Sequence, residues 1–269
     1  MLPVEIVSAL LGTVIGFILA LTGAGGAMLA IPLLVFFLPI SIFQAAPIAL
    51  LAVFMATSIG AIQGLWKGIV RYKTTLLLAT TGMILAPFGV KLAQYSSNKF
   101  LAMLLVLILL VVGLRSWQQT KQNISDHSQA PATACTLNPA TSTLYWTASC
   151  TKCLIRTGAL TGFLSGLLGV GGGFIIAPSL RKSTNFNNPS VIATALAATS
   201  LIATSSIASH IHSNTIEWHI ALPFAFSATL SMLIVSEFLS PKIPDNVTQK
   251  VFAILCLLAA LQLASKTLI

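Results

Sequence analysis

The sequence predicts an all-α integral membrane protein with two homologous inverted repeats, each a glycine-broken helical hairpin plus about three transmembrane helices. Three observations predict this class. Hydrophobic residues make up 56% of the 269 positions and charged residues only 7%, whereas soluble domains carry about 25% charged residues. Apolar runs as long as a bilayer crossing follow one another along the chain. A glycine-rich stretch also occurs twice, once in each half.

Six apolar runs are each long enough to cross a bilayer as one helix. Three lie in each half of the chain, at residues 43–66, 74–95, 99–117, 191–209, 219–240 and 250–268. Two longer apolar segments, 4–38 and 155–180, contain the glycine-rich stretches. The first of them opens with Glu5 and without a basic region, so we do not expect a cleaved signal peptide.

The glycine-rich stretches interrupt segments that are otherwise helical in composition. "LTGAGGAMLAIP" spans residues 21–32 and "LLGVGGGFIIAP" spans residues 167–178, a constant offset of 146 residues. Glycine weakens a helix and the following proline lacks an amide proton, so we expect a break in each segment. Broken backbone inside a bilayer must be buried in protein or line a polar cavity, because lipid cannot satisfy its N–H and C=O groups.

We expect the two breaks to meet near the membrane midplane and to bind an anion there. A new short helix is predicted from Ala27 and another from Phe174, and the N-terminal amides of a helix favour negative charge. The predicted substrate-binding residues of the breaks are Gly23, Gly25, Gly26, Ala27, Gly169, Gly171, Gly172, Gly173 and Phe174. The alternative is that these glycines serve only close helix packing.

Polar residues inside the apolar runs are further candidates for this substrate site. The pairs Thr57-Ser58 and Thr199-Ser200 recur shortly after the hairpins, and hydroxyl groups suit an oxyanion that accepts several hydrogen bonds. The alternative for each hydroxyl is a bond to its own helix backbone. His210 is a candidate proton relay, with a neutral histidine at the membrane interface as the alternative.

The 14 Lys and Arg residues predict the orientation of the repeats, because positive charge concentrates on the cytoplasmic side. If each glycine segment crossed the membrane once, these residues would divide eight to six. If each segment enters and returns on one side, eleven share a side and only Lys91, Lys99 and Lys266 oppose them. We therefore predict inverted repeats with both termini outside. Lys67 and Arg71 are expected to anchor the interface, or else to attract anions to the cytoplasmic mouth.

Three regions are predicted: a first membrane repeat at 1–117, a polar cytoplasmic linker at 118–151 and a second membrane repeat at 152–269. The linker is rich in Ser, Thr, Gln, Pro and Asn and cannot bury a core, so we expect a tether. Cys135, Cys150 and Cys153 are interpreted as reduced thiols. The alternative is a redox or metal site at the pair Cys150-Thr-Lys-Cys153.

These features resemble the sulfite exporter TauE/SafE family of membrane transporters. The resemblance rests on "GFLSGLLGVGGGFIIAP" at 162–178, on the weaker "GFILALTGAGGAMLAIP" at 16–32 and on the two-half layout. It implies a secondary transporter, and specifically an exporter, of small sulfur-containing anions such as sulfite or organosulfonates in the bacterial inner membrane. The first copy departs from the second, because Ala27 stands where the second has Gly173.

Absences in the sequence narrow the function further. None of the five acidic residues lies at the centre of an apolar run, and HExxH, P-loop and nucleophile-elbow motifs do not occur. We therefore expect no enzyme, cofactor, metal or nucleic-acid partner. The expected partners are the lipid bilayer, a small anionic substrate and a coupling ion, H⁺ or Na⁺. Two alternatives stay open: a passive anion channel and a cysteine-dependent membrane redox or assembly factor.

Overall fold

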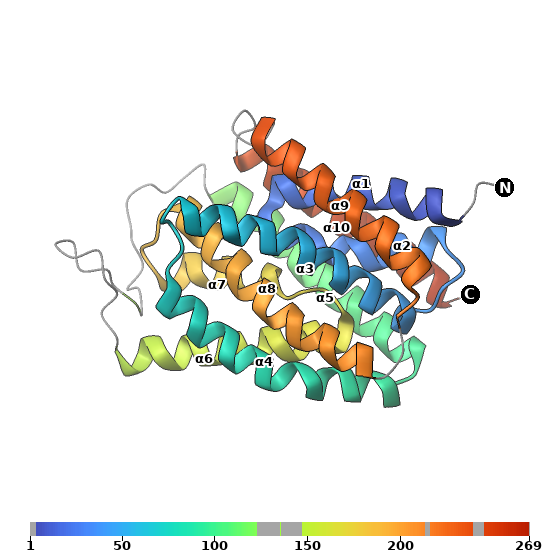
Figure 1. Cartoon of the computed structure of the whole chain (residues 1–269), viewed down its shortest axis with the longest axis horizontal. Helices are drawn as coiled ribbons and strands as arrows, with labels where there is room; N and C mark the ends of the chain where they lie inside the picture. Colours follow the sequence, from blue (N-terminus) through green and yellow to red (C-terminus); the bar gives the residue numbers. More distant parts are fainter. Residues whose placement is uncertain (1–3, 123–134, 136–146, 213–215, 239–244, 269) are drawn as a thin grey trace.

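The computed structural model describes residues 4–122, 135, 147–212, 216–238 and 245–268. Every predicted apolar run is helical over its described residues (Figure 1). The elements are α1 (Val4–Thr22), the 3₁₀ helix η1 (Gly23–Leu29), α2 (Ala30–Phe37), α3 (Ile42–Trp66), α4 (Tyr72–Tyr95), α5 (Asn98–Gln122), α6 (Ala148–Leu168), α7 (Gly173–Ser183), α8 (Asn188–His212), α9 (Trp218–Phe238) and α10 (Asp245–Leu268).

Seven helices in this described part of the chain are long and apolar enough to cross a membrane: α1, α3, α4, α5, α8, α9 and α10. The prediction of an all-α, multi-pass integral membrane protein is therefore confirmed. Of the region between Gln122 and Thr147, where the polar linker was predicted, only Cys135 belongs to the described residues.

Each glycine segment joins a long helical arm to a short one. In the first half, η1 connects α1, of 19 residues, to α2, of 8 residues. In the second half, residues 169–172 connect α6, of 21 residues, to α7, of 11 residues. The arms of the second hairpin run antiparallel, since the Thr157 and Ser179 hydroxyl oxygens lie 2.8 Å apart across them.

The two halves of the chain exchange their packing partners. α1 packs along α9 of the second half, whereas α6 packs along α4 of the first half. α3 crosses α8, and α5 packs against α10. Exchanging the halves converts the α1–α9 pairing into the α6–α4 pairing and leaves the α3–α8 and α5–α10 pairings unchanged, which is the relation expected of two repeats. In Figure 1, α1 begins at the end where α10 ends, and α6 begins at the opposite end. The inverted orientation of the repeats in a membrane stays a prediction.

Glycines at equivalent positions of the two repeats allow helices to approach backbone to backbone. A Cβ atom on Gly162 of α6 would lie 2.0 Å from the carbonyl oxygen of Gly82 on α4. A Cβ atom on Gly16 of α1 would lie 2.1 Å from the carbonyl oxygen of Ala228 on α9. Small residues are the usual means of close helix contact in membranes, because apolar side chains gain little by leaving lipid. These two glycines therefore fix the crossings of α6 with α4 and of α1 with α9.

Replacing Gly162 with alanine is expected to lower the free energy of unfolding by about 1–3 kcal/mol, because the added methyl group pushes α6 away from α4. Gly113→Ala is the matched control, since its Cβ would meet only side chains, at 3.3 Å. Thermal unfolding of the purified variants in detergent measures the difference. Equal melting temperatures for Gly162→Ala and Gly113→Ala would contradict the assignment.

Candidate functional site

The second-half break is a short loop built on left-handed glycines. Gly169, Gly171 and Gly172 have φ angles of +72°, +70° and +69°, a region that other residues rarely adopt. Gly172 is the N-cap of α7, which begins at Gly173. The helix predicted from Phe174 thus starts one residue earlier. All residues from 169 to 174 are buried in the protein, as a break at membrane depth requires.

The glycines of this loop lie in close contact with helices of both halves. A Cβ atom on Gly169 would meet the Cα atom of Ala46 on α3 at 2.5 Å. One on Gly172 would meet the Thr161 methyl carbon on α6 at 2.2 Å. The alternative interpretation of these glycines, close packing, therefore applies at the loop, and their part in substrate binding stays a prediction.

The first-half break differs from the expectation of an open helix start at Ala27. Instead, η1 contains Gly23, Gly25, Gly26 and Ala27 and passes directly into α2. The Ala30 N–H donates to the Ala27 carbonyl oxygen, so this stretch satisfies that amide within the chain. Ala27 replaces the glycine found at position 173, and Gly26 lacks the left-handed φ of its counterpart Gly172. η1 does contact α7, so the two glycine segments meet.

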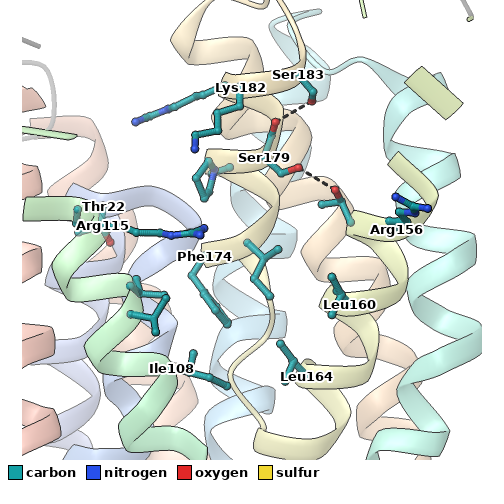
Figure 2. Close-up of a pocket in the computed structure, with 18 of the residues that line it drawn as sticks. Thr22, Ile108, Arg115, Arg156, Leu160, Leu164, Phe174, Ser179, Lys182 and Ser183 are labelled. Atoms are coloured by element: carbon teal, nitrogen blue, oxygen red, sulfur yellow. Dashed lines mark hydrogen bonds between the residues drawn. The ribbon is translucent and has the colours of Figure 1, made fainter. Parts of the chain in front are cut away.

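A cavity of about 1030 Å³ lies between α5, α6 and α7, beside the second-half break (Figure 2). We call it the basic cavity, because its lining carries five exposed cationic side chains. These side chains are Arg115, Lys152, Arg156, Arg181 and Lys182. Among the described residues that line the basic cavity, none is acidic. A cleft with one sign of charge raises the local concentration of its counter-ion, here an anion.

The basic cavity follows α7 from these cations to the first turn of the helix. Figure 2 shows Arg115 reaching from α5 toward α7, while Phe174 points into the space between α5 and α6. Polar groups continue along the way, since the Ser183 hydroxyl donates to the Ser179 carbonyl oxygen at 2.7 Å. Phe174 is a predicted site residue that lines this cavity. An anion entering the basic cavity therefore approaches the N-terminal end of α7.

The five cations of the basic cavity were not among the site residues predicted from the sequence. Their common position was visible only in the charge tally, which placed all five on the linker side. Lys67 and Arg71, for which interface anchoring or anion attraction was predicted, do not line the cavity. The Arg71 guanidinium instead lies 5.7 Å from the ring centre of Phe186.

The predicted Thr-Ser pairs are brought together where α3 crosses α8. A Cβ atom on Gly60 would contact Leu196, and one on Gly64 would contact Ala193. These contacts show that α3 and α8 run antiparallel along the stretch that precedes Gly60 and follows Leu196, where the two pairs lie. The four predicted residues of these pairs lie outside the lining of the basic cavity.

Their hydroxyl groups differ in what they bind. The Thr57 hydroxyl donates to the Val53 carbonyl oxygen at 2.6 Å, and the Ser200 hydroxyl donates to that of Ala197 at 2.9 Å. Both bonds stay within one helix, as the alternative interpretation expects. Ser58 is half-buried. The Thr199 hydroxyl is fully buried and has no hydrogen-bond partner in the described part of the chain, so it keeps its donor available.

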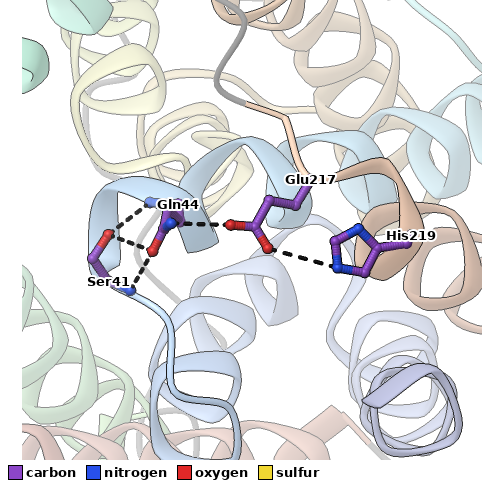
Figure 3. Close-up of polar contacts among 4 residues, drawn as sticks. All are labelled: Ser41, Gln44, Glu217 and His219. Atoms are coloured by element: carbon purple, nitrogen blue, oxygen red, sulfur yellow. Dashed lines mark hydrogen bonds and ion pairs between the residues drawn. The ribbon is translucent and has the colours of Figure 1, made fainter. Parts of the chain in front are cut away.

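The end of the molecule opposite the basic cavity carries a polar cluster between α3 and α9 (Figure 3). Glu217 accepts a hydrogen bond of 3.0 Å from the Gln44 side-chain amide and lies 4.0 Å from the His219 ring nitrogen. Gln44 also pairs with Ser41 in a capping box at the start of α3. The bond between Gln44 and Glu217 therefore joins the two halves of the chain at this end.

His210 lies on α8 near the same end of the molecule. Its side chain is completely buried, and its ring centre is 6.1 Å from that of Phe43 on α3. His210 does not line the basic cavity. The role of His210 as a proton relay stays a prediction.

The cysteines differ from the expectation of reduced thiols. Cys135 forms a disulfide with Cys150, and Cys153 is free and lines the basic cavity. The Cys135 N–H also donates to the Ser183 carbonyl oxygen, which ties residue 135 to the ends of both α6 and α7. Disulfides persist in oxidising compartments, whereas the positive charges favour a cytoplasmic location for this end.

A thiol-specific mass tag is expected to modify two cysteines, Cys153 and Cys256, when the protein is denatured without reductant. All four should react after reduction. In Cys135→Ser, Cys150 has lost its partner, so three thiols should react without reductant. Tagging of four cysteines in the unreduced wild-type protein would show that the disulfide is not formed.

Comparisons with known proteins point to one family. The family model described as "Sulfite exporter TauE/SafE" matches residues 8–263. A "Probable membrane transporter protein" of Xylella fastidiosa strain 9a5c is 25% identical over 258 residues, which cover 93% of this chain and 91% of the relative. A protein of the same name from strain Temecula1 is 26% identical over 218 residues, covering 79% and 76%. No solved structure matches the chain significantly.

Proposed function

Since this chain belongs to the sulfite exporter TauE/SafE family, we propose that it is a secondary transporter, exporting small sulfur-containing anions such as sulfite or organosulfonates. Both Xylella relatives carry the name of a membrane transporter, which supports the general function. The substrate, the direction and the coupling to H⁺ or Na⁺ are our proposals.

The basic cavity is the observation that carries this proposal. Its five cations make no ion pair with a carboxylate among the described residues, so their charge is available to a soluble anion. Because they are exposed, they avoid the cost of burying a charge in a low-dielectric interior. Deeper in the protein, the α7 amides offer hydrogen-bond donors without a full charge. An arrangement with exposed cations at the mouth and neutral donors deeper in the protein suits an anion that must bind and then leave.

The polar cluster at the end of the molecule opposite the basic cavity fits a transport cycle. A secondary transporter exposes its site to one side of the membrane at a time, by moving one part of the fold against another. The basic cavity is open at one end, and the hydrogen bond between Gln44 and Glu217 joins α3 to α9 at the other. We propose that this arrangement is the state that loads substrate from the linker side. Release on the far side then requires the Gln44–Glu217 bond to break.

Uptake of labelled sulfite into proteoliposomes tests the function. Flux is expected to saturate and to be inhibited by sulfoacetate, taurine or thiosulfate, but not by acetate. Non-saturating flux would instead indicate a passive channel. Replacing Cys150 and Cys153 with serine is expected to leave transport intact, whereas a cysteine-dependent redox factor would lose its function. The absence of sulfite flux under both H⁺ and Na⁺ gradients would overturn the proposal.

Neutralising the mouth of the basic cavity is expected to weaken substrate capture. The double variant Arg115→Gln/Arg181→Gln should lower kcat/KM for sulfite about tenfold at low salt, because electrostatic attraction raises encounter rates. The deficit should shrink at high ionic strength, where exposed charges are screened. Lys91→Gln is the matched control, since Lys91 is exposed on α4 and does not line the cavity. An unchanged kcat/KM in the double variant would remove the cavity from the substrate path.

A further inference from the structure

Two hydroxyl groups on α6 are buried without a partner. Thr161 and Ser165 are each 0% exposed, and neither hydroxyl has a hydrogen-bond partner in the described part of the chain. A buried hydroxyl left unpaired costs about 1–3 kcal/mol. Other hydroxyls on membrane helices avoid that cost by bonding to their own backbone, and Thr157 on the same helix does so with the Cys153 carbonyl oxygen. Thr161 and Ser165 therefore have free donors that the fold itself does not use.

Both residues border the second-half break. The Thr161 side chain lies against Gly172, the N-cap of α7, and the Ser165 carbonyl oxygen accepts the N–H of Gly169 at 2.8 Å. Ser165 and Thr161 thus stand beside the first and last glycines of the left-handed loop.

The loop also presents unpaired amides. The first N–H groups of a helix lack partners within the helix. Those of Ile175 and Ile176 donate to the Gly172 carbonyl oxygen, at 3.0 and 3.4 Å. No hydrogen bond to another described residue is seen for the N–H groups of Gly173 and Phe174, so they are available to a ligand. The Thr161 side chain, which contacts Gly172 through its methyl carbon, therefore lies beside these amides at the N-terminus of α7.

A row of hydroxyl groups connects this place with the basic cavity. Thr157, Thr161 and Ser165 follow one another at four-residue spacing, so they share one face of α6. Thr157 lines the basic cavity and contacts Ser179 of α7, whereas the next two residues lie deeper in the protein. Polar groups therefore extend beyond the cavity toward the glycine loop.

We propose that Thr161 and Ser165 donate hydrogen bonds to the oxygens of the transported anion, bound at the N-terminus of α7. This inference rests on the proposed function and narrows its substrate class to small oxyanions with several acceptor oxygens. The anion supplies the acceptors that both hydroxyls lack, and the amides of Gly173 and Phe174 bind further oxygens. Such a site favours oxyanions over an anion that cannot engage several donors at once.

Sulfite transport by hydroxyl-deleted variants tests this site. Thr161→Val and Ser165→Ala are each expected to raise KM for sulfite about tenfold or more, because a hydrogen bond to a charged group is among the stronger ones. Thr161→Ser keeps the hydroxyl and should transport with nearly the wild-type KM. Thr229→Val is the matched control, because its buried hydroxyl already bonds to the Ala225 carbonyl oxygen at 2.6 Å.

The outcomes separate this site from the proposed function. If wild-type protein transports sulfite and both deletions keep its KM, the site is wrong and the function stands. Equal KM increases in Thr161→Ser and Thr161→Val also exclude a role for the Thr161 hydroxyl. If the wild-type protein transports no sulfur oxyanion, both proposals fall. The elution profile and the melting temperature of each variant show whether it is folded. If Thr161→Val does not fold, the KM of Ser165→Ala decides whether the site is correct.

Discussion

Lipid offers no hydrogen bonds to peptide groups, and this constraint shapes the whole molecule. Along the apolar runs, helices pair the peptide groups with one another. In the two glycine segments the helix is interrupted, so the peptide groups there need other partners. In the first half, the glycine segment forms a 3₁₀ helix, which keeps hydrogen bonds within the backbone of the same segment. The second half opens into a loop on left-handed glycines and buries that loop between α3 and α6. One constraint has thus produced two solutions from related sequences.

The bounds of the helices could be predicted closely, because the length of each apolar run in the sequence gives the length of the helix. The run at 43–66 is helix α3 over Ile42–Trp66, and the run at 74–95 is α4 over Tyr72–Tyr95. The form of each break could not be predicted, since Gly26 and Gly172 stand at equivalent positions and only Gly172 adopts a left-handed φ. The cations of the basic cavity were missed because they gather only when α5, α6 and α7 pack together. The pairing of Cys135 with Cys150 rather than with Cys153 likewise depends on tertiary contact.

Charge and hydrogen bonding are divided along the length of α7. The cations stay at the exposed end, where water solvates them, and the deeper part offers neutral donors. A cation at the same depth would hold an anion more tightly, but burying it costs several kcal/mol and slows release. Thr161, Ser165 and the amides of α7 avoid both costs. The division explains why the buried part of the proposed site contains hydroxyls and glycines, residue types that composition alone would assign to helix packing.

The exchange of packing partners has a consequence for biosynthesis. α1 leaves the ribosome long before α9, the helix that covers its glycine face. Until α9 has been inserted, Gly12 and Gly16 face lipid or a temporary neighbour. In the same way, α4 lacks its packing partner until α6 has been made. Such non-local pairing slows folding, since chain segments far apart in sequence must find each other. During translation, the helices of the first repeat therefore lack their native packing partners. The native packing forms only when the second repeat has been inserted.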